Sequence, residues 1–170
     1  PDYKILSSNN SYVELEFYPK YSRLIEITYN NETFKRLTFE NAKANNIGNS
    51  GKPGIASRVF SVILPSEENN KLTIVDYEFI EAGNINLAPV PTMMYRNPNS
   101  RDFENTEYAY LKDNIAYSHS KYVPEQIAFI EETGLVRETI LSNLVINPLQ
   151  YNPVSKTLRQ YTRIRVRINF

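Results

Sequence analysis

The chain has 170 residues, and its 19 Lys and Arg side chains balance 19 Asp and Glu side chains, so the formal net charge at pH 7 is zero. This length suits one domain with its own core, and the balanced charge gives no overall attraction to nucleic acid or to an anionic membrane. The sequence contains no cysteine, which excludes thiolate catalysis, disulfides and sulfur-ligated metals, and we expect neither a metal nor a cofactor.

The first predicted strands lie between residues 11 and 41. Residues 11–19 alternate between apolar and polar side chains, as a half-buried strand does. Residues 23–41 contain two apolar stretches around Asn30-Asn31, and asparagine tolerates the positive φ that a tight hairpin turn requires. We therefore predict a strand followed by a hairpin.

Residues 42–54 are rich in Asn, Gly, Ser and Lys and have no hydrophobic period, so they are predicted to form a loop. The loop includes Gly51-Lys52, a pair that occurs in phosphate-binding loops. Such a loop needs a glycine at the position of Asn46 and a hydroxyl side chain at the position of Pro53. The sequence therefore argues against nucleotide binding of that kind.

Residues 55–65 and 71–87 are dense in Val, Ile, Leu and aromatic side chains and are predicted strands, with a polar turn between them. From residue 88 to 114 the chain has no sustained period, and a loop of this length is usually functional or disordered. Within it, the segment Met93-Met94-Tyr95 has two interpretations, a packing anchor in the protein's own core or an apolar contact with a partner.

His119 is the one histidine of the chain. A Ser-His-Asp triad would depend on it, but no nucleophile turn accompanies it in the sequence. We therefore interpret His119 as a solvated loop or strand-end residue. No apolar run reaches the roughly 20 residues that a membrane-spanning helix needs, so no membrane span is expected.

In the last third of the chain, Pro124 argues against a clean helix at the start of residues 122–134, and Gly134 is expected to end that segment. Strands are predicted over residues 135–142, 144–148 and 158–170. Asn152-Pro153 indicates a corner, since the residue before proline avoids the helical region. About this corner, residues 144–147 and 158–170 are expected to return on each other as a long hairpin. Tyr151 and Tyr161 would flank it, and sugar stacking is their weaker alternative role.

Short strands separated by turns, with no repeated strand–helix–strand pattern, indicate an all-β fold. We expect an antiparallel two-sheet β-sandwich or jelly roll with one long irregular loop, folded as a single domain over residues 1–170.

The closing strand is the most regular one. From Thr162 onward, apolar residues alternate with Arg163, Arg165 and Arg167, so the strand has one apolar face and one face of guanidinium groups. The arginine row is either a solvated strand face, or a charged edge that resists pairing with other chains, or a docking stripe for an acidic partner.

The order of motifs between residues 48 and 170 resembles one known family. GKPGIASRVFSVILP is followed by APVPT, SKYVPEQ and GLVRE, and then by INPLQYNP and LRQYTRIRVRINF. This order is similar to that of the amino-terminal prodomain of the gingipain-type cysteine endopeptidases, secreted caspase-like proteases of the type IX secretion route. The closing segment is the most specific part, and the first forty residues carry no motif that matches.

The resemblance implies a non-catalytic prodomain whose catalytic residues lie outside this chain. Prodomains of this family assist folding of the protease and inhibit it with a loop that places a basic side chain in the specificity pocket. We expect this loop within residues 92–114, and an arginine suits the pocket because its guanidinium pairs bidentately with a carboxylate. Arg101 ranks first because it lies in the middle of NPNSRDFEN among turn-forming residues, Arg96 ranks second because it is nearer Met93-Met94-Tyr95, and Lys112 would serve only a protease that prefers lysine. The alternative for each of the three is a solvated surface charge. The expected partner is a cognate caspase-like cysteine protease catalytic domain, and the expected location is exported: periplasm, cell surface or secreted.

Two other functions remain alternatives on the sequence alone. One is a permanent amino-terminal scaffold domain of a gingipain-like sortase of the type IX secretion system. The other is a carbohydrate-binding β-sandwich, which the tyrosine content suggests. Glu104, Glu107, Tyr108 and Tyr110 offer acids and aromatic rings for it, but their spacing fits no ligand pattern.

Overall fold

The computed structural model describes residues 1–43, 49–65, 69–95, 106–136 and 139–170. In these ranges the fold is all-β and its sheets are antiparallel, as the sequence predicts. The strands are β1 (Tyr3–Ser8), β2 (Tyr12–Phe17), β3 (Ile25–Tyr29), β4 (Glu32–Arg36), β5 (Arg58–Leu64), β6 (Lys71–Ala82), β7 (Thr92–Tyr95), β8 (Thr106–Ala109), β9 (Ala128–Val136), β10 (Thr139–Ile146), β11 (Leu149–Asn152) and β12 (Thr157–Asn169), with a short 3-10 helix, η3 (Ala116–Ser118).

The larger sheet is built around β12. This strand pairs with β6 along almost its whole length, and on its other side it pairs first with β11 and then with β2, which in turn pairs with β1. Its inward side chains Ile164, Val166 and Ile168 are almost completely buried, because alternation places every second residue on the core face. The predicted apolar face of the closing strand is therefore confirmed.

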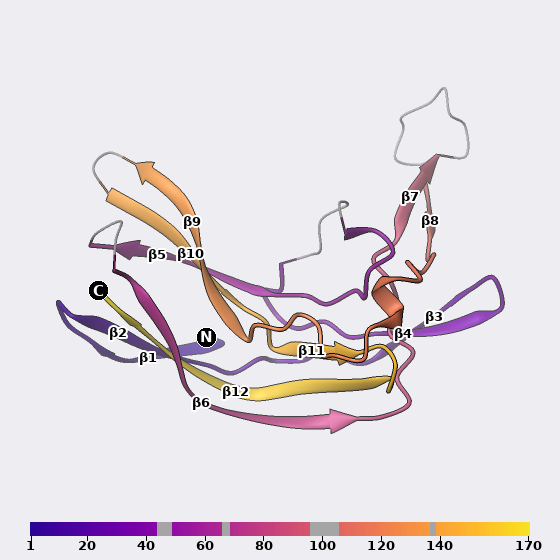
Figure 1. Ribbon diagram of the computed structural model, residues 1–170, viewed down its shortest axis with the longest axis horizontal. Coiled ribbons are helices and arrows are strands. Elements are labelled where there is room, and N and C mark those ends of the chain that lie inside the picture. The colour runs from indigo at the N-terminus through magenta and orange to yellow at the C-terminus, as the bar shows by residue number, and fades with distance from the viewer. Residues whose placement is uncertain (44–48, 66–68, 96–105, 137–138) are drawn as a thin grey trace.

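The second sheet has the order β5-β10-β9 and forms the other layer, which lies above β12 and β6 in Figure 1. The core between the layers combines Phe17 of β2 with Phe60 of β5, whose rings meet edge to face at 5.8 Å, and with Leu144 and Ile146 of β10. Burial of these apolar side chains against Ile164 and its neighbours on β12 joins the two sheets.

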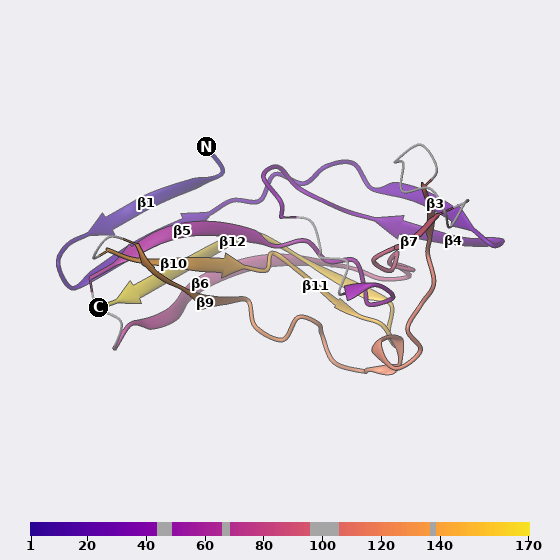
Figure 2. The same ribbon diagram turned by 90° about the horizontal axis from the view of Figure 1, so that it is seen from above.

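Two hairpins lie at the end of the molecule far from the C-terminus (Figure 1), and Figure 2 shows the same arrangement from above. The β3–β4 hairpin turns at Asn30 and Asn31, whose φ values are 48° and 63°, so the predicted hairpin and its asparagine turn are confirmed. The second hairpin, β7–β8, projects away from the two layers.

The expected hairpin between residues 144–147 and 158–170 is wrong. Residues 144–146 belong to β10 in the smaller sheet, and the partner of β12 at the corner is β11. The chain crosses between sheets at Asn147-Pro148, where the Asn147 amide donates to the Ile127 carbonyl and the Pro148 carbonyl accepts from the Tyr161 amide. Similarly, β5 and β6 follow each other in sequence but pair in different sheets.

Residues 92–114 also contain more regular structure than the sequence predicts. β7 and β8 pair in register, with Met93 opposite Tyr108 and Tyr95 opposite Thr106. Four residues per strand are too few for a hydrophobic period to stand out, so the sequence alone reads this passage as irregular. Its described residues include two short paired strands, which begin directly after Pro91.

Candidate functional site

The candidate inhibitory residues fall on or near the β7–β8 hairpin. Arg96 and Arg101 lie between its two strands in the sequence, and both are outside the described residues. Lys112 is described and follows β8 by three positions. The structure thus describes the two paired strands, β7 and β8, that flank the segment with Arg96 and Arg101 in the sequence.

The base of the hairpin is held by the segment around Gly51. The Gly51 amide donates to the Val90 carbonyl at 2.9 Å, and the Val90 amide donates to the Lys52 carbonyl at 2.8 Å. On the other side, the Asp113 amide donates to the Gly51 carbonyl at 3.0 Å. Gly51 has φ +84°, and a Cβ there would lie 3.1 Å from the Asp113 nitrogen, so this close approach requires glycine.

Lys112 is engaged inside the protein. Its ammonium forms an ion pair with Glu32 and donates to the Asn86 side-chain oxygen at 3.0 Å, and it lies 5.0 Å from the ring centroid of Phe34 and 5.3 Å from that of Tyr117. The hydrogen bond from Lys112 holds the pKa of the Glu32 carboxyl below its usual range. Lys112 therefore links the β3–β4 hairpin to the chain that leaves β8.

The arginine row of β12 is paired with carboxylates on the neighbouring strands. Arg163 contacts Glu16 of β2 at 3.0 Å and, on the other side, Asp76 at 2.6 Å and Glu78 at 2.9 Å on β6. These carboxylates, Asp76 first, raise the pKa of Arg163. The guanidinium is thus shared by three strands of one sheet.

Arg165 and Arg167 form ion pairs with the same carboxylate, Glu14 of β2, which is only 2% exposed. Because β12 lies between β2 and β6, it is an interior strand, and the interpretation of the row as a protected sheet edge is wrong. The row lies on the outer face, where its charges are compensated within the sheet.

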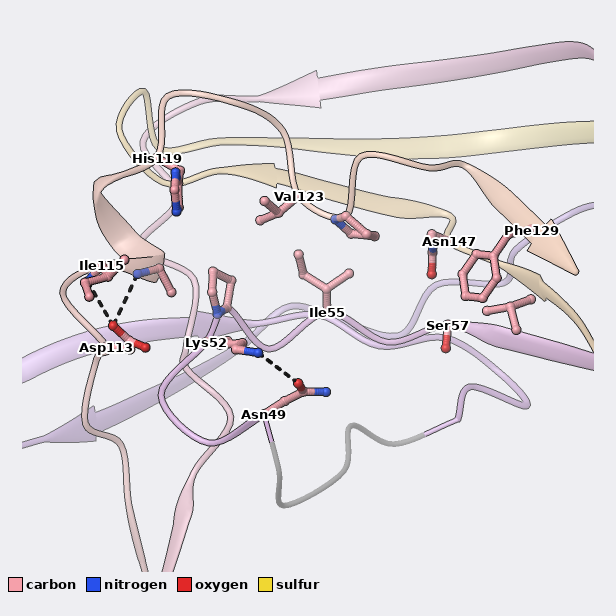
Figure 3. Close-up of a pocket in the computed structure, with 14 residues that line it drawn as sticks. Asn49, Lys52, Ile55, Ser57, Asp113, Ile115, His119, Val123, Phe129 and Asn147 are labelled. Atoms are coloured by element: carbon pink, nitrogen blue, oxygen red, sulfur yellow. Dashed lines mark hydrogen bonds between the residues drawn. The ribbon is translucent and has the colours of Figure 1, made fainter. Parts of the chain in front are cut away.

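A pocket of about 530 Å³ lies between the segment 49–57, the chain around η3 and the smaller sheet (Figure 3). Ile55 and Val123 point toward one another across it, and Phe129 and Val145 add apolar walls. The polar groups at its rim include Lys52, whose ammonium donates to the Asn49 side chain at 3.4 Å.

His119 lines this pocket and is exposed, as the sequence predicts. Within the ranges that the structure describes, no hydrogen bond or ion pair engages its imidazole. The Asp113 carboxylate, the acid of the pocket, accepts from the amides of Ile115 at 2.9 Å and Ala116 at 3.3 Å and thereby holds the turn that leads into η3. This geometry does not assemble a histidine-activated nucleophile.

Tyr151 and Tyr161 are each 1% exposed, so neither offers a ring face to a sugar. The Tyr151 hydroxyl donates to the Ile85 carbonyl at 2.7 Å, and the Tyr161 hydroxyl donates to the Gln150 side chain at 2.7 Å. Among the described residues, no cluster of three or more His, Asp or Glu side chains could hold a metal ion, and no helix there is long and apolar enough to cross a membrane.

Sequence reasoning missed a second pocket at this end of the molecule. Met93 and Tyr108 stand opposite each other on the hairpin and line a second pocket together with Arg36. Arg36 is the last residue of β4, and no local motif indicates that it would meet residues 88–93. Only the long-range packing of the two hairpins reveals this site.

Comparison with known proteins agrees with this architecture. The Propeptide_C25 family model matches residues 1–170, which extends the resemblance over the first forty residues. Gingipain R1 of Porphyromonas gingivalis is 33% identical over 124 residues, or 73% of this chain and 12% of that protein. Gingipain R2 of the same species is 26% identical over 169 residues, or 99% of this chain and 22% of that protein. The chain therefore spans less than a quarter of these relatives.

Two solved structures share the fold. The complex of the RgpB pro- and mature domains of Porphyromonas gingivalis matches with a TM-score of 0.84 and 25% identity, over 99% of this chain and 83% of the matched chain. A structure on the zymogenic latency of gingipain K from the same species matches with a TM-score of 0.76 and 16% identity, over 99% and 91% of the two chains, which supports the fold alone. The chain belongs to the Propeptide_C25 family and is a propeptide domain of the gingipain type.

Proposed function

We propose that this chain is a non-catalytic prodomain that assists the folding of a cognate gingipain-like cysteine protease and inhibits it until the two parts separate. The observation that carries the proposal is the family match over all 170 residues, together with the likeness to a prodomain that was solved in complex with its mature domain. The catalytic residues then belong to the partner, in agreement with a chain that has no cysteine.

The inhibitory element is the segment between β7 and β8, with a basic side chain that enters the specificity pocket of the protease. Arg101 is the first candidate and Arg96 the second, because both lie in the sequence between two paired strands whose base is fixed to Gly51. An arginine fits an acidic pocket through its planar array of donors and its permanent charge. The internal ion pair of Lys112 with Glu32 supports a structural role for this lysine instead of insertion.

The arginine row of β12 is a weaker candidate for docking. Arg163, Arg165 and Arg167 already contact carboxylates of their own sheet, so an acidic partner would have to displace these contacts. We propose instead that these arginines stabilise the larger sheet by linking its neighbouring strands. By family likeness we also propose an exported location, in the periplasm, at the cell surface or secreted, with the protease as partner.

The test is inhibition of the cognate mature protease domain by this chain added in trans. The unaltered chain is expected to inhibit at nanomolar concentration, and the double variant Arg96→Ala/Arg101→Ala is expected to inhibit at least about 100-fold less, because it leaves the acid of the specificity pocket unpaired. Arg23→Ala, an exposed arginine on a different segment, is the matched control and is expected to inhibit like the unaltered chain.

Two outcomes would contradict the proposal. The first is an unaltered chain that does not inhibit the cognate protease, which favours a permanent scaffold domain. The second is a double variant that inhibits as well as the unaltered chain, which removes the basic residues from the mechanism. A glycan-binding screen tests the carbohydrate-binding alternative independently of inhibition.

A further inference from the structure

A second pocket, of about 470 Å³, lies against the β7–β8 hairpin. We call it the hairpin pocket and define it by Arg36, Pro89, Met93, Tyr108 and Tyr110. It lies on the opposite face of the segment 52–57 from the pocket of Figure 3, since Ile55 and Ser57 line that pocket whereas Gly54 and Ala56 line the hairpin pocket.

The hairpin pocket is continuous with the candidate inhibitory segment. Met93 and Tyr108 are cross-strand neighbours, and Met93 precedes Arg96 by three positions. Any partner that receives the segment beyond Tyr95 in its active site therefore lies close to these two side chains. This position next to the candidate inhibitory segment is the first reason to assign a docking role to the hairpin pocket.

The residue types of the pocket are those that protein interfaces favour. Methionine, tyrosine and arginine are enriched at interface cores, and tyrosine and arginine dominate binding hot spots. Tyr108 is 54% exposed and ready for contact. Behind it, Tyr110 packs against Tyr29 and Phe34 with ring centroids 6.2 and 6.5 Å apart, so the floor of the pocket is braced by the β3–β4 hairpin.

The charge of Arg36 supplies the third reason. Most other arginines in the described ranges have carboxylate partners: Arg58 has Asp2, Arg159 has Glu81, and the β12 arginines have theirs, whereas Arg23, which lies away from this pocket, has none there. Arg36 is exposed and has no carboxylate partner within the described residues. An exposed guanidinium beside an apolar pocket attracts a partner group that combines an apolar side chain with a neighbouring carboxylate.

We propose that the hairpin pocket is a second docking site for the mature protease domain, which inserts an apolar side chain between Met93 and Tyr108 and pairs a carboxylate with Arg36. This inference rests on the proposed function and deepens it: the prodomain then holds the protease at two places, the specificity pocket and a surface beside it. Two linked contacts raise affinity beyond either one, because the second binds at high effective concentration.

The experiment separates the two contacts. The mature domain is first treated with a small covalent inhibitor that fills its active site, so that the binding of this chain that remains reports docking outside the specificity pocket. Tyr108→Ala and Arg36→Glu are each expected to weaken this binding by at least about tenfold. They are also expected to weaken inhibition of the free protease.

Matched controls lie close by. Met94→Ala changes the neighbour of Met93 on the same strand, with its side chain on the opposite face and 47% exposed, and Arg23→Glu makes the same charge change elsewhere. Lys52→Glu likewise replaces a positive charge by a negative one, but in the pocket of Figure 3. All three are expected to bind like the unaltered chain, and thermal unfolding checks that every variant is folded.

The outcomes distinguish this inference from the proposed function. If the unaltered chain inhibits but Tyr108→Ala and Arg36→Glu bind and inhibit equally well, the docking site is overturned and the function stands. If Lys52→Glu weakens binding and the two hairpin-pocket variants do not, the partner uses the other face and the inference is overturned. If the unaltered chain does not inhibit the protease, the proposed function itself fails.

Discussion

At the scale of single residues, Glu14 is the most constrained charge of the larger sheet. The alternation of β2 places it on the same face as the arginine row of β12, and the register sets it opposite Arg167. Its carboxylate accepts from the Arg167 Nε at 2.7 Å and also pairs with Arg165. The hydrogen bond from Arg167, with the help of Arg165, lowers the pKa of Glu14 although burial opposes the shift.

Replacement of Glu14 is expected to destabilise the fold. Glu14→Gln keeps the shape of the side chain but leaves Arg165 and Arg167 without their carboxylate, at a cost of about 2 kcal/mol, between the values of exposed and of fully buried ion pairs. Urea unfolding at pH 7 measures this free energy. Glu40→Gln is the control, because its ion pair with Lys20 is exposed at both ends and is expected to contribute about 0–1 kcal/mol. Equal effects of the two changes would contradict the role assigned to Glu14.

At the scale of elements, the sequence predicts well those strands whose signals are local. The alternation that ends at Phe170 and the Asn30-Asn31 turn both depend on side chains that lie close together in the chain, and both are confirmed. The pairing of β12 with β11 was missed, because Leu144 and Leu149 are equally apolar and only packing between the sheets decides which stretch meets β12. The local pattern does not carry that information.

In the candidate site, too, features with a local sequence signal were predicted and features that depend on long-range packing were not. The family resemblance led to the segment between Pro91 and Asn114, and the structure adds the paired strands that frame it. The partner of Lys112 and the pocket beside Tyr108 were not predicted. Glu32 lies 80 positions from Lys112 in the sequence, and a contact at that separation has no periodic or motif signature.

The Lys112–Glu32 pair is expected to set the position of the β7–β8 hairpin. Lys112→Met and Glu32→Gln should each weaken inhibition by about tenfold, and the double variant no more than either one, because both remove the same contact. Inhibition constants of the four chains give this double-mutant cycle. Lys20→Met/Glu40→Gln removes an exposed pair elsewhere and should change nothing. If Lys112 instead enters the specificity pocket, Glu32→Gln frees it and inhibition is unchanged or stronger.

At the scale of the whole molecule, the charges divide into two groups. Carboxylates and guanidinium groups of β2, β6 and β12 neutralise each other on the outer face of the larger sheet. Near the hairpins, Arg36 and Lys52 have no carboxylate partner among the described residues. A chain with zero formal net charge thus keeps an exposed guanidinium, that of Arg36, in the pocket beside the β7–β8 hairpin. Such a cation favours contact with an acidic group of a partner.

The paired carboxylates also determine how stability depends on pH. Hydrogen bonds from neighbouring side chains lower the pKa of several of them below the ordinary values of 4.5 for Glu and 3.8 for Asp. The leading donors are Arg167 for Glu14, Tyr18 for Glu16, Lys112 for Glu32, Arg163 for Asp76 and Tyr122 for Glu81. As pH falls, the unfolded chain binds protons before the folded one does, so the equilibrium shifts toward unfolding.

The urea midpoint of unfolding is therefore expected to be the same at pH 7 and pH 5.5, to begin to fall near pH 4.5, and to fall further at pH 3.5, all at one ionic strength. The stabilisation is present above the unfolded-state pKa values and is lost as pH drops through the folded-state values. Glu14→Gln should show a shallower decline, because it removes one of the groups that titrate, whereas Glu40→Gln should follow the unaltered chain. A midpoint that stays constant or rises down to pH 3.5 would show that these ion pairs do not link the strands of the sheet.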